Sequence, residues 1–201
     1  MAQKYAFLID PSKCTFCRAC VTACKLENHV RSQWTRNDVV LIGPDQRKDP
    51  AMYAVFMNCQ QCENPPCVAA CPVEGKGLEK RADGIVLVKD SKCVSNQFCV
   101  RACPYGALRL TSVRNAHGYE VVDKCTYCAH KLDRPADAPG GNRPACVMTC
   151  PTNAIEFGLR DEILARVKQE GRETFDVDPV GVGPSNIFVK PSPRRQAWEK
   201  V

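Results

Sequence analysis

The sequence has no apolar run that approaches the roughly 20 residues needed to cross a membrane. Its first ten residues, MAQKYAFLID, contain neither a basic segment followed by an apolar one nor a small-residue cleavage site, which argues against a secretory signal peptide. Only three histidines are present, and their spacing is not typical of a metal site. No Ser-His-Asp set, pair of catalytic acids or phosphate-binding glycine loop with a following lysine is found. The chain is therefore not expected to be an enzyme by itself.

Cysteine is the residue that the sequence has in excess, with 15 among 201 residues. In a small secreted chain such a content would indicate disulfides. Here the number is odd and no signal peptide is expected, so metal binding is the better interpretation.

The cysteines form four groups with similar spacing. The first two groups are Cys14, Cys17, Cys20 and Cys24, and then Cys59, Cys62, Cys67 and Cys71. The third group is Cys93, Cys99 and Cys103, with Asn96 where a second cysteine is expected, and the fourth is Cys125, Cys128, Cys146 and Cys150. A proline follows the last cysteine of the second, third and fourth groups and is expected to end a helix there.

The segments around the groups are also repeated. Short strand-like runs, YAFLID, IVLVKD and YEVVD, precede three of the groups, and ALRL and AIEF follow two Cys-Pro ends. Each unit therefore predicts a strand, a cysteine loop, a short helix, a turn and a second strand. After about residue 160, DEILARVKQE predicts an amphipathic helix, and the remainder looks extended.

Soft thiolate ligands select zinc, Cu(I) or iron–sulfur clusters, and the spacing decides among them. Three cysteines in C-x2-C-x2-C can hold three corners of one cluster, while a fourth on the following helix points to a neighbouring cluster. Paired cluster centres would then lie about 10–12 Å apart, close enough for electron tunnelling. A zinc ribbon instead uses two separate C-x2-C pairs without a fourth cysteine before proline. A zinc-stabilised interaction module is thus a weaker alternative.

The motifs DPSKCTFCRACVTACKLEN, CQQCENPPCVAACP and CVRACPYGAL resemble those of the four-cluster ferredoxin-like subunits of molybdenum and tungsten bis-pyranopterin oxidoreductases. That family includes the dimethyl sulfoxide and polysulfide reductases, formate dehydrogenases and tungsten aldehyde oxidoreductases. The resemblance covers residues 4 to about 160. It implies an electron-transfer subunit that relays single electrons to or from a large molybdenum- or tungsten-pterin catalytic subunit. The alternative is a subunit of a hydrogenase-type complex or a free polyferredoxin.

The resemblance also implies which cysteines share a cluster. Cluster 1 would take Cys14, Cys17, Cys20 and Cys150, and cluster 2 would take Cys59, Cys62, Cys67 and Cys103. Cluster 3 would take Cys93, Cys99 and Cys71, with Asn96 at the vacant position, and cluster 4 would take Cys125, Cys128, Cys146 and Cys24. Clusters 1, 2 and 4 would be [4Fe–4S].

Asn96 leaves three alternatives for cluster 3. A [3Fe–4S] cluster, which lacks the iron without a ligand, is favoured. A [4Fe–4S] cluster with the Asn96 oxygen or water as the fourth ligand is the second, and loss of the cluster is the third. The three retained cysteines argue against the last.

The expected fold is α+β and consists of two interleaved bacterial-type ferredoxin modules, with loop insertions and an extended C-terminal segment. The outer module comprises residues 1–30 and 113–160, and the inner module comprises residues 52–112. Residues 31–51 would be an insertion. Residues 161–201 would form a C-terminal helix and an extended segment that docks on a partner.

The formal net charge of +6 counts thiols as neutral. Fifteen thiolates around three 4Fe cores of about +2 and one 3Fe core of about +1 would bring the charge to about −2. The basic excess is then compensation, and no nucleic-acid partner is expected. The expected second partner is a membrane quinone or cytochrome subunit, a flavoprotein or a ferredoxin. The chain is expected in the cytoplasm, or in the periplasm if a signal-bearing partner carries it out.

Several residues beside the cysteines are candidates for tuning the clusters. Lys13, Lys92 and Lys124 each precede the first cysteine of a group and could offset cluster charge, although a solvated lysine is an equal alternative. Aromatic residues within the motifs are expected to pack against the clusters and exclude water rather than relay electrons. These are Phe16, Tyr105 and Tyr127.

Overall fold

The computed structural model describes residues 4–31, 33–43, 52–74, 77–135, 137–138 and 141–191. The strands are two to six residues long and the helices four to ten. The prediction of a small α+β fold built from short elements is confirmed. Within the described ranges, no helix is both long and apolar enough to cross a membrane.

A four-stranded sheet contains strands from both the N-terminal and the C-terminal parts of the chain. It has the order β8-β1-β10-β9, and its strands are β1 (Tyr5–Ile9), β8 (Ile155–Leu159), β9 (Thr174–Phe175) and β10 (Ile187–Val189). β1 pairs antiparallel with β8 and parallel with β10. Strand pairing thus places β1 beside β8, about 150 residues later in the sequence, and beside β10, about 180 residues later.

Both faces of β1 are buried, as alternation along a strand allows. Ala6 and Leu8 pack against Ile163 and Val167 of helix α6 (Arg160–Gln169). Phe7 on the opposite face contacts the rings of Phe56, Tyr127 and Phe157. The sheet therefore separates α6 from the main core.

The other strands form three antiparallel hairpins. These are β2 (Asn37–Ile42) with β3 (Tyr53–Asn58), β4 (Leu78–Lys80) with β5 (Val86–Val88), and β6 (Arg109–Arg114) with β7 (Glu120–Asp123). The helices are α1 (Ala19–Glu27), α2 (Pro66–Ala69), α3 (Phe98–Ala102), α4 (Ala129–Leu132) and α5 (Ala145–Thr149). A 3₁₀ turn at Asp90–Lys92 precedes the third cysteine group.

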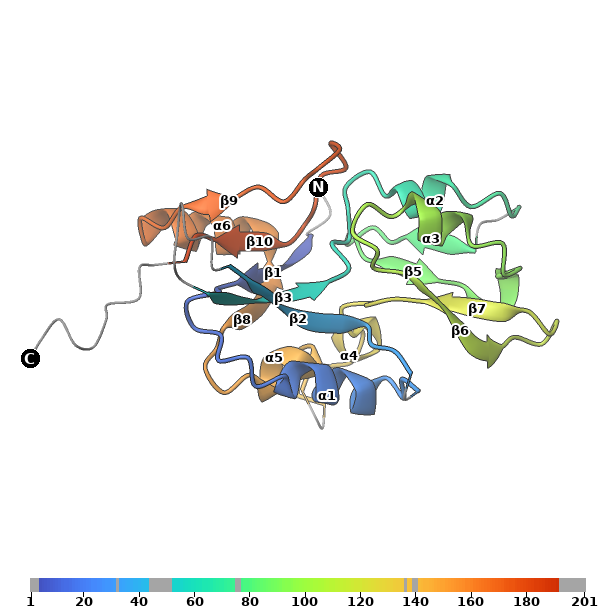
Figure 1. The fold of residues 1–201 in the computed structure, drawn as a ribbon, viewed down its shortest axis with the longest axis horizontal. Coiled ribbons are helices and arrows are strands. Elements are labelled where there is room, and N and C mark those ends of the chain that lie inside the picture. Colours follow the sequence, from blue (N-terminus) through green and yellow to red (C-terminus); the bar gives the residue numbers. More distant parts are fainter. Residues whose placement is uncertain are drawn as a thin grey trace, which may run out of the picture.

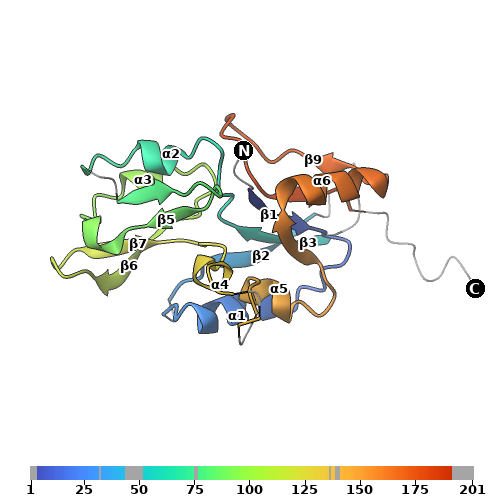
Figure 2. The ribbon, with the colours of Figure 1, turned by 180° about the vertical axis from the view of Figure 1, so that it is seen from behind.

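The helices pack in two pairs at different places in the molecule. α1 lies beside α5 under the β2–β3 hairpin, and α2 lies beside α3 next to β5, β6 and β7 (Figure 1). The view from behind shows the same two groupings (Figure 2). In sequence, α1 and α5 bracket the α2–α3 pair, so the polypeptide leaves the first grouping and returns to it.

The C-terminal segment contacts the chain itself over most of its described length. Glu63 N–H donates to the Gly183 carbonyl at 2.7 Å, and Ser185 N–H donates to the Gln60 carbonyl at 2.9 Å. We call residues 178–189 the C-terminal strap. The predicted helix after residue 160 is confirmed as α6, whereas β9 and β10 were not foreseen. Residues 192–201 of the predicted docking segment lie outside the described residues.

Part of the predicted insertion at 31–51 is also regular structure, because residues 37–42 form β2 and pair fully with β3. Its NDVVLI run is β-branched and apolar, which in retrospect is the local signal of a strand.

Candidate iron–sulfur cluster sites

All 15 cysteines lie in described residues, none is in a disulfide, and 11 of them are buried. Each of the four predicted combinations contains one cysteine from a distant segment of the sequence. Two of these combinations line hollows. In the other two, the charge of one thiol contributes to the raised pKa of another.

The first combination lines a small hollow. Its thiols come from the loop before α1, from the first turn of α1 and from the C-terminal end of α5: Cys14 and Cys17, Cys20, and Cys150. Val39, Phe56 and Ile155 supply apolar walls. Cys17 is exposed, so this hollow reaches the surface.

The second combination lines a similar small hollow beside α2 and α3. Its thiols are Cys59, Cys62, Cys67 and Cys103, and Val86, Tyr105 and Leu108 complete the wall. The two hollows match in composition, with four thiols, a Cys-Pro step and apolar side chains.

The third and fourth combinations are recognised from the pKa shifts of buried thiols. Burial, followed by the charges of Cys93 and Cys71, raises the pKa of Cys99 to about 11. Burial, followed by the charges of Cys125 and Cys128, raises the pKa of Cys24 well above its ordinary value. The pKa of Cys146 is raised in the same way by burial, Cys125, Cys128 and Cys24.

Crowding of thiols is a general property of these sites. Burial and neighbouring thiols raise the pKa of Cys20, Cys62 and Cys67 to about 12. Four thiolates so close together need a positive core to offset their charge, and iron–sulfide cores provide it. The residues present therefore fit the group that their spacing predicts.

The loops that carry the first cysteines share one backbone feature. In every group the residue two positions after the first cysteine has a left-handed conformation, although none is glycine. These residues are Phe16, Gln61, Ser95 and Tyr127, with φ of 60°, 45°, 60° and 54°. Non-glycine residues adopt this region at a cost, and they concentrate at functional sites. The third loop keeps this geometry even though Asn96 replaces a cysteine.

Backbone N–H groups point at the sulfur atoms that follow the helices. Ala154 N–H donates to Cys150 Sγ at 3.2 Å, and Ala107 N–H donates to Cys103 Sγ at 3.4 Å. Gly77 N–H donates to Cys71 Sγ at 3.2 Å. In Cys150, burial raises the pKa, but the N–H groups of Ala154 and its neighbours outweigh it and lower the pKa overall. Such donors stabilise bound thiolates and tune cluster potential.

Side-chain amides supply further donors that sequence reasoning missed. Asn28 Nδ2 lies 3.6 Å from Cys24 Sγ and 3.9 Å from Cys128 Sγ. Asn58 Nδ2 lies 3.6 Å from Cys125 Sγ. The only sequence signal was a polar residue within four positions of a cysteine, which is too common to be informative.

The three motif aromatics differ in their surroundings. Tyr127 is fully buried against Phe7 and Phe157, and its hydroxyl donates to Asn186 Oδ1. Tyr105 lines the second hollow, whereas Phe16 is 38% exposed beside Cys17. Water exclusion is thus consistent with Tyr127 and Tyr105 but not with Phe16.

The three lysines also differ. Lys13 and Lys92 are exposed, whereas Lys124 is completely buried. The sequence offers no means of separating them, because each stands directly before a cysteine.

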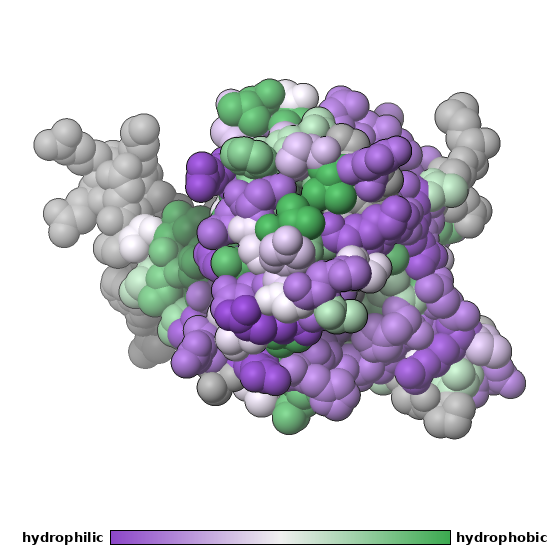
Figure 3. Space-filling view, turned by 90° about the vertical axis from the view of Figure 1, so that its right-hand side faces the viewer, coloured by the Kyte–Doolittle hydropathy of each residue, from purple (hydrophilic) through white to green (hydrophobic). Residues whose placement is uncertain are grey.

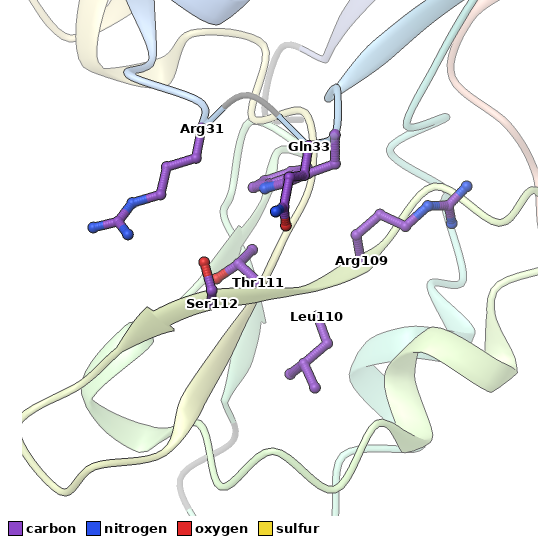
Figure 4. Close-up of a pocket in the computed structure, with 7 residues that line it drawn as sticks. Arg31, Gln33, Arg109, Leu110, Thr111 and Ser112 are labelled. Atoms are coloured by element: carbon purple, nitrogen blue, oxygen red, sulfur yellow. The ribbon is translucent and has the colours of Figure 1, made fainter.

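Two further observations concern possible sites for other ligands. In the described part of the chain, no three His, Cys, Asp or Glu side chains converge closely enough to hold one metal ion. A separate open groove contains no cysteine, and in it Arg31 and Arg109 extend in opposite directions (Figure 4). Its lining is Arg31, Gln33, Trp34, Arg109, Leu110, Thr111 and Ser112.

Comparison with known proteins agrees with this chemistry. The 4Fe-4S dicluster domain matches residues 50–160, and the 4Fe-4S binding domain matches residues 7–26. The chain is 35% identical over 164 residues to the thiosulfate reductase electron transfer subunit of Salmonella typhi, covering 81% of this chain and 79% of that one.

Two further relatives are similar. A polysulfide reductase chain of Wolinella succinogenes is 37% identical over 161 residues, which are 79% of this chain and 78% of the relative. A tetrathionate reductase subunit of Salmonella typhimurium is 36% identical over 157 residues, which are 77% of this chain and 58% of the relative. The chain therefore belongs to the family of ferredoxin-like iron–sulfur subunits of molybdenum and tungsten oxidoreductases, in which it transfers electrons and is not the catalytic subunit.

Proposed function

We propose that this subunit relays single electrons through four clusters between a large molybdenum- or tungsten-pterin catalytic subunit and a second redox partner. The observation that supports the proposal most directly is a pair of hollows that are each lined by four cysteine side chains. Mutual charge effects among buried thiols of the other two combinations support it further. The second partner in this proposal is a membrane quinone or cytochrome subunit, a flavoprotein or a ferredoxin. Clusters supply one-electron redox chemistry when bound, and the protein supplies ligands, burial and hydrogen bonds.

The proposed ligands are the four combinations of cysteines that the family resemblance implies. Clusters 1, 2 and 4 are [4Fe–4S] in this proposal, held by Cys14, Cys17, Cys20 and Cys150, by Cys59, Cys62, Cys67 and Cys103, and by Cys125, Cys128, Cys146 and Cys24. Cluster 3 is held by Cys93, Cys99 and Cys71.

Cluster 3 is proposed to be [3Fe–4S]. Asn96 Oδ1 accepts the N–H of Phe98 at 3.2 Å, so this oxygen is engaged in its own loop. The left-handed Ser95 preserves the cluster-loop geometry, which argues against loss of the cluster. Three thiols and an engaged amide favour a core with three irons over a fourth iron held by Asn96.

The interleaving of two ferredoxin modules is also part of the proposal. Pairing of β1 with β8 and packing of α1 on α5 support an outer module of residues 1–30 and 113–160. Packing of α2 on α3 supports an inner module of residues 52–112.

Partner contacts are proposed at two places in this arrangement. The end with α2, α3, β6 and β7 presents small hydrophobic patches among hydrophilic residues (Figure 3). Val94 and Phe98, which flank Asn96, are 39% and 48% exposed. In the first cysteine group, Cys17 and Phe16 are also exposed. The segment from residue 161 contributes to docking through its exposed positions, such as Val180.

Whether the assembly is cytoplasmic or periplasmic depends in this proposal on an export signal in its partner.

Anaerobic purification of the native assembly tests the proposal. We expect about 15 iron atoms per chain with matching acid-labile sulfide, a large subunit containing molybdenum or tungsten, and an EPR signal near g ≈ 2.01 when oxidised. Zinc in place of iron would instead indicate an interaction module. Iron with a nickel-containing partner would point to a hydrogenase-type complex.

A further inference from the structure

Lys124 is a fully buried lysine between two of the cysteine combinations, with 0% of its surface exposed. Its Nζ donates to the carbonyl oxygens of Cys125, at 2.9 Å, and of Val86, and to Gln61 Oε1 at 3.4 Å. Three donors meet three acceptors, which is the pattern of a protonated ammonium.

The acceptors are all uncharged. No carboxylate in the described ranges forms an ion pair with Lys124, unlike Lys131, which pairs with Glu27. A buried cation is costly unless negative charge lies nearby. Bound clusters carry that charge, because four thiolates outweigh a core of about +2. The environment of Lys124 is therefore complete only when the adjacent sites are loaded.

Lys124 lies next to two combinations. Its hydrogen-bond partners Gln61 and Val86 line the second hollow, and it also donates to the carbonyl of Cys125, which belongs to the fourth combination. The thiols of Cys67 and Cys125 have a pKa raised by burial and by Cys59, and in both the Lys124 charge acts in the opposite direction. Cys67 belongs to the second combination and Cys125 to the fourth. Gln61, which also contacts Lys124, donates Nε2 to the Cys125 carbonyl at 2.8 Å and accepts the Val86 N–H at 2.7 Å. The lysine and its partners thus form the junction between the two combinations.

We propose that Lys124 is a positioning residue for electron transfer, whose buried charge raises the reduction potentials of clusters 2 and 4 together. This rests on the proposed ligand sets. Reduction of either cluster adds negative charge near the same cation. A cation shared by both clusters therefore shifts the two potentials in the same direction, and the driving force for electron transfer between them changes little.

The test is EPR-monitored redox titration of the native complex with Lys124→Met. A unit charge at about 10 Å in protein of effective dielectric about 20 changes the one-electron reduction equilibrium by about tenfold. That change corresponds to about 59 mV. We expect two of the four midpoint potentials to fall by about this amount and the other two to remain. The matched control is Lys92→Met, which also removes a lysine directly before a cysteine, but an exposed one. Its shifts should be much smaller.

Three results would overturn the proposal: a fully loaded Lys124→Met protein with unchanged potentials, an equal fall in all four, or equal shifts in Lys92→Met. If Lys124→Met loses iron, Lys124→Arg decides. If Lys124→Arg keeps its full iron content and unchanged potentials, the positive charge at position 124 is what the clusters require. If Lys124→Arg also loses iron, the size and shape of lysine are what the site requires, and the proposal is refuted. Failure of the proposed function is distinguishable, because the unmodified protein would then contain no iron or would co-purify with a nickel-containing partner.

Discussion

Asn186 of the C-terminal strap donates its side-chain amide to Asn58 Oδ1 at 2.7 Å, and Asn58 in turn directs its own amide at Cys125 Sγ. The same Asn186 accepts hydrogen bonds from the Phe7 N–H and the Tyr127 hydroxyl. One buried amide near the C-terminus thus connects β1, the second cysteine loop and the fourth cysteine loop. The strap therefore supports the loops that carry the cysteines.

Replacing Asn186 with alanine is expected to loosen this scaffold. Buried partners that lose a hydrogen bond cost about 1–3 kcal/mol, and three partners are affected here. We expect a lower midpoint of thermal unfolding and faster loss of the roughly 400 nm cluster absorbance under chelator. Asn142→Ala, at an exposed position, is the control. Equal behaviour of the two variants would show that the strap does not support the sites.

Gly183 tests how closely the strap must approach the second cysteine loop. A Cβ there would lie 2.9 Å from Glu63 Cβ, and its φ is +64°. Gly183→Ala should therefore lower the free energy of unfolding by about 2 kcal/mol or more, from backbone strain and from the close contact. Gly118→Ala has the same type of strain, with φ +79°, but nothing within 4 Å. The difference between the variants in denaturant unfolding measures the contact alone, and a difference of zero would contradict it.

Local sequence patterns were sufficient for elements that carry their own signal. YAFLI, VLV and EVVD form strands β1, β5 and β7, and the helix expected after residue 160 is α6. The three residues of β10 are too few to show alternation, and their strand character depends on pairing with β1. Lys124 illustrates the same limit at the site. Its burial is produced by Val86 and Gln61, which are distant in sequence, so its neighbours along the chain could not reveal it.

Asn28 provides a test of hydrogen bonding to sulfur. Its amide lies near Cys24 Sγ and Cys128 Sγ, and Arg36 donates to its oxygen at 2.7 Å, which fixes its orientation. Hydrogen bonds to sulfur raise reduction potential, because they favour the more negative reduced state. A hydrogen bond of this kind contributes about 1–2 kcal/mol, and only the part that differs between the oxidised and reduced clusters changes the potential. Asn28→Ala is therefore expected to lower one midpoint potential by tens of mV. His29→Ala, the exposed neighbour, should leave all potentials unchanged. A potential that rises in Asn28→Ala would contradict this interpretation.

Asn96→Cys tests the assignment of the third combination. It restores a thiol two residues before Phe98 in a loop whose Ser95 already has the left-handed geometry shared by the other three groups. The variant should gain about one iron per chain and lose the g ≈ 2.01 signal, because a fourth thiolate can hold the missing corner. Val94→Cys adds a thiol to the same loop, at an exposed position that does not match the ligand spacing, and should keep the signal. If the unmodified protein already contains about 16 irons and shows no such signal, the three-iron assignment is wrong and a fourth iron is held there without a thiolate.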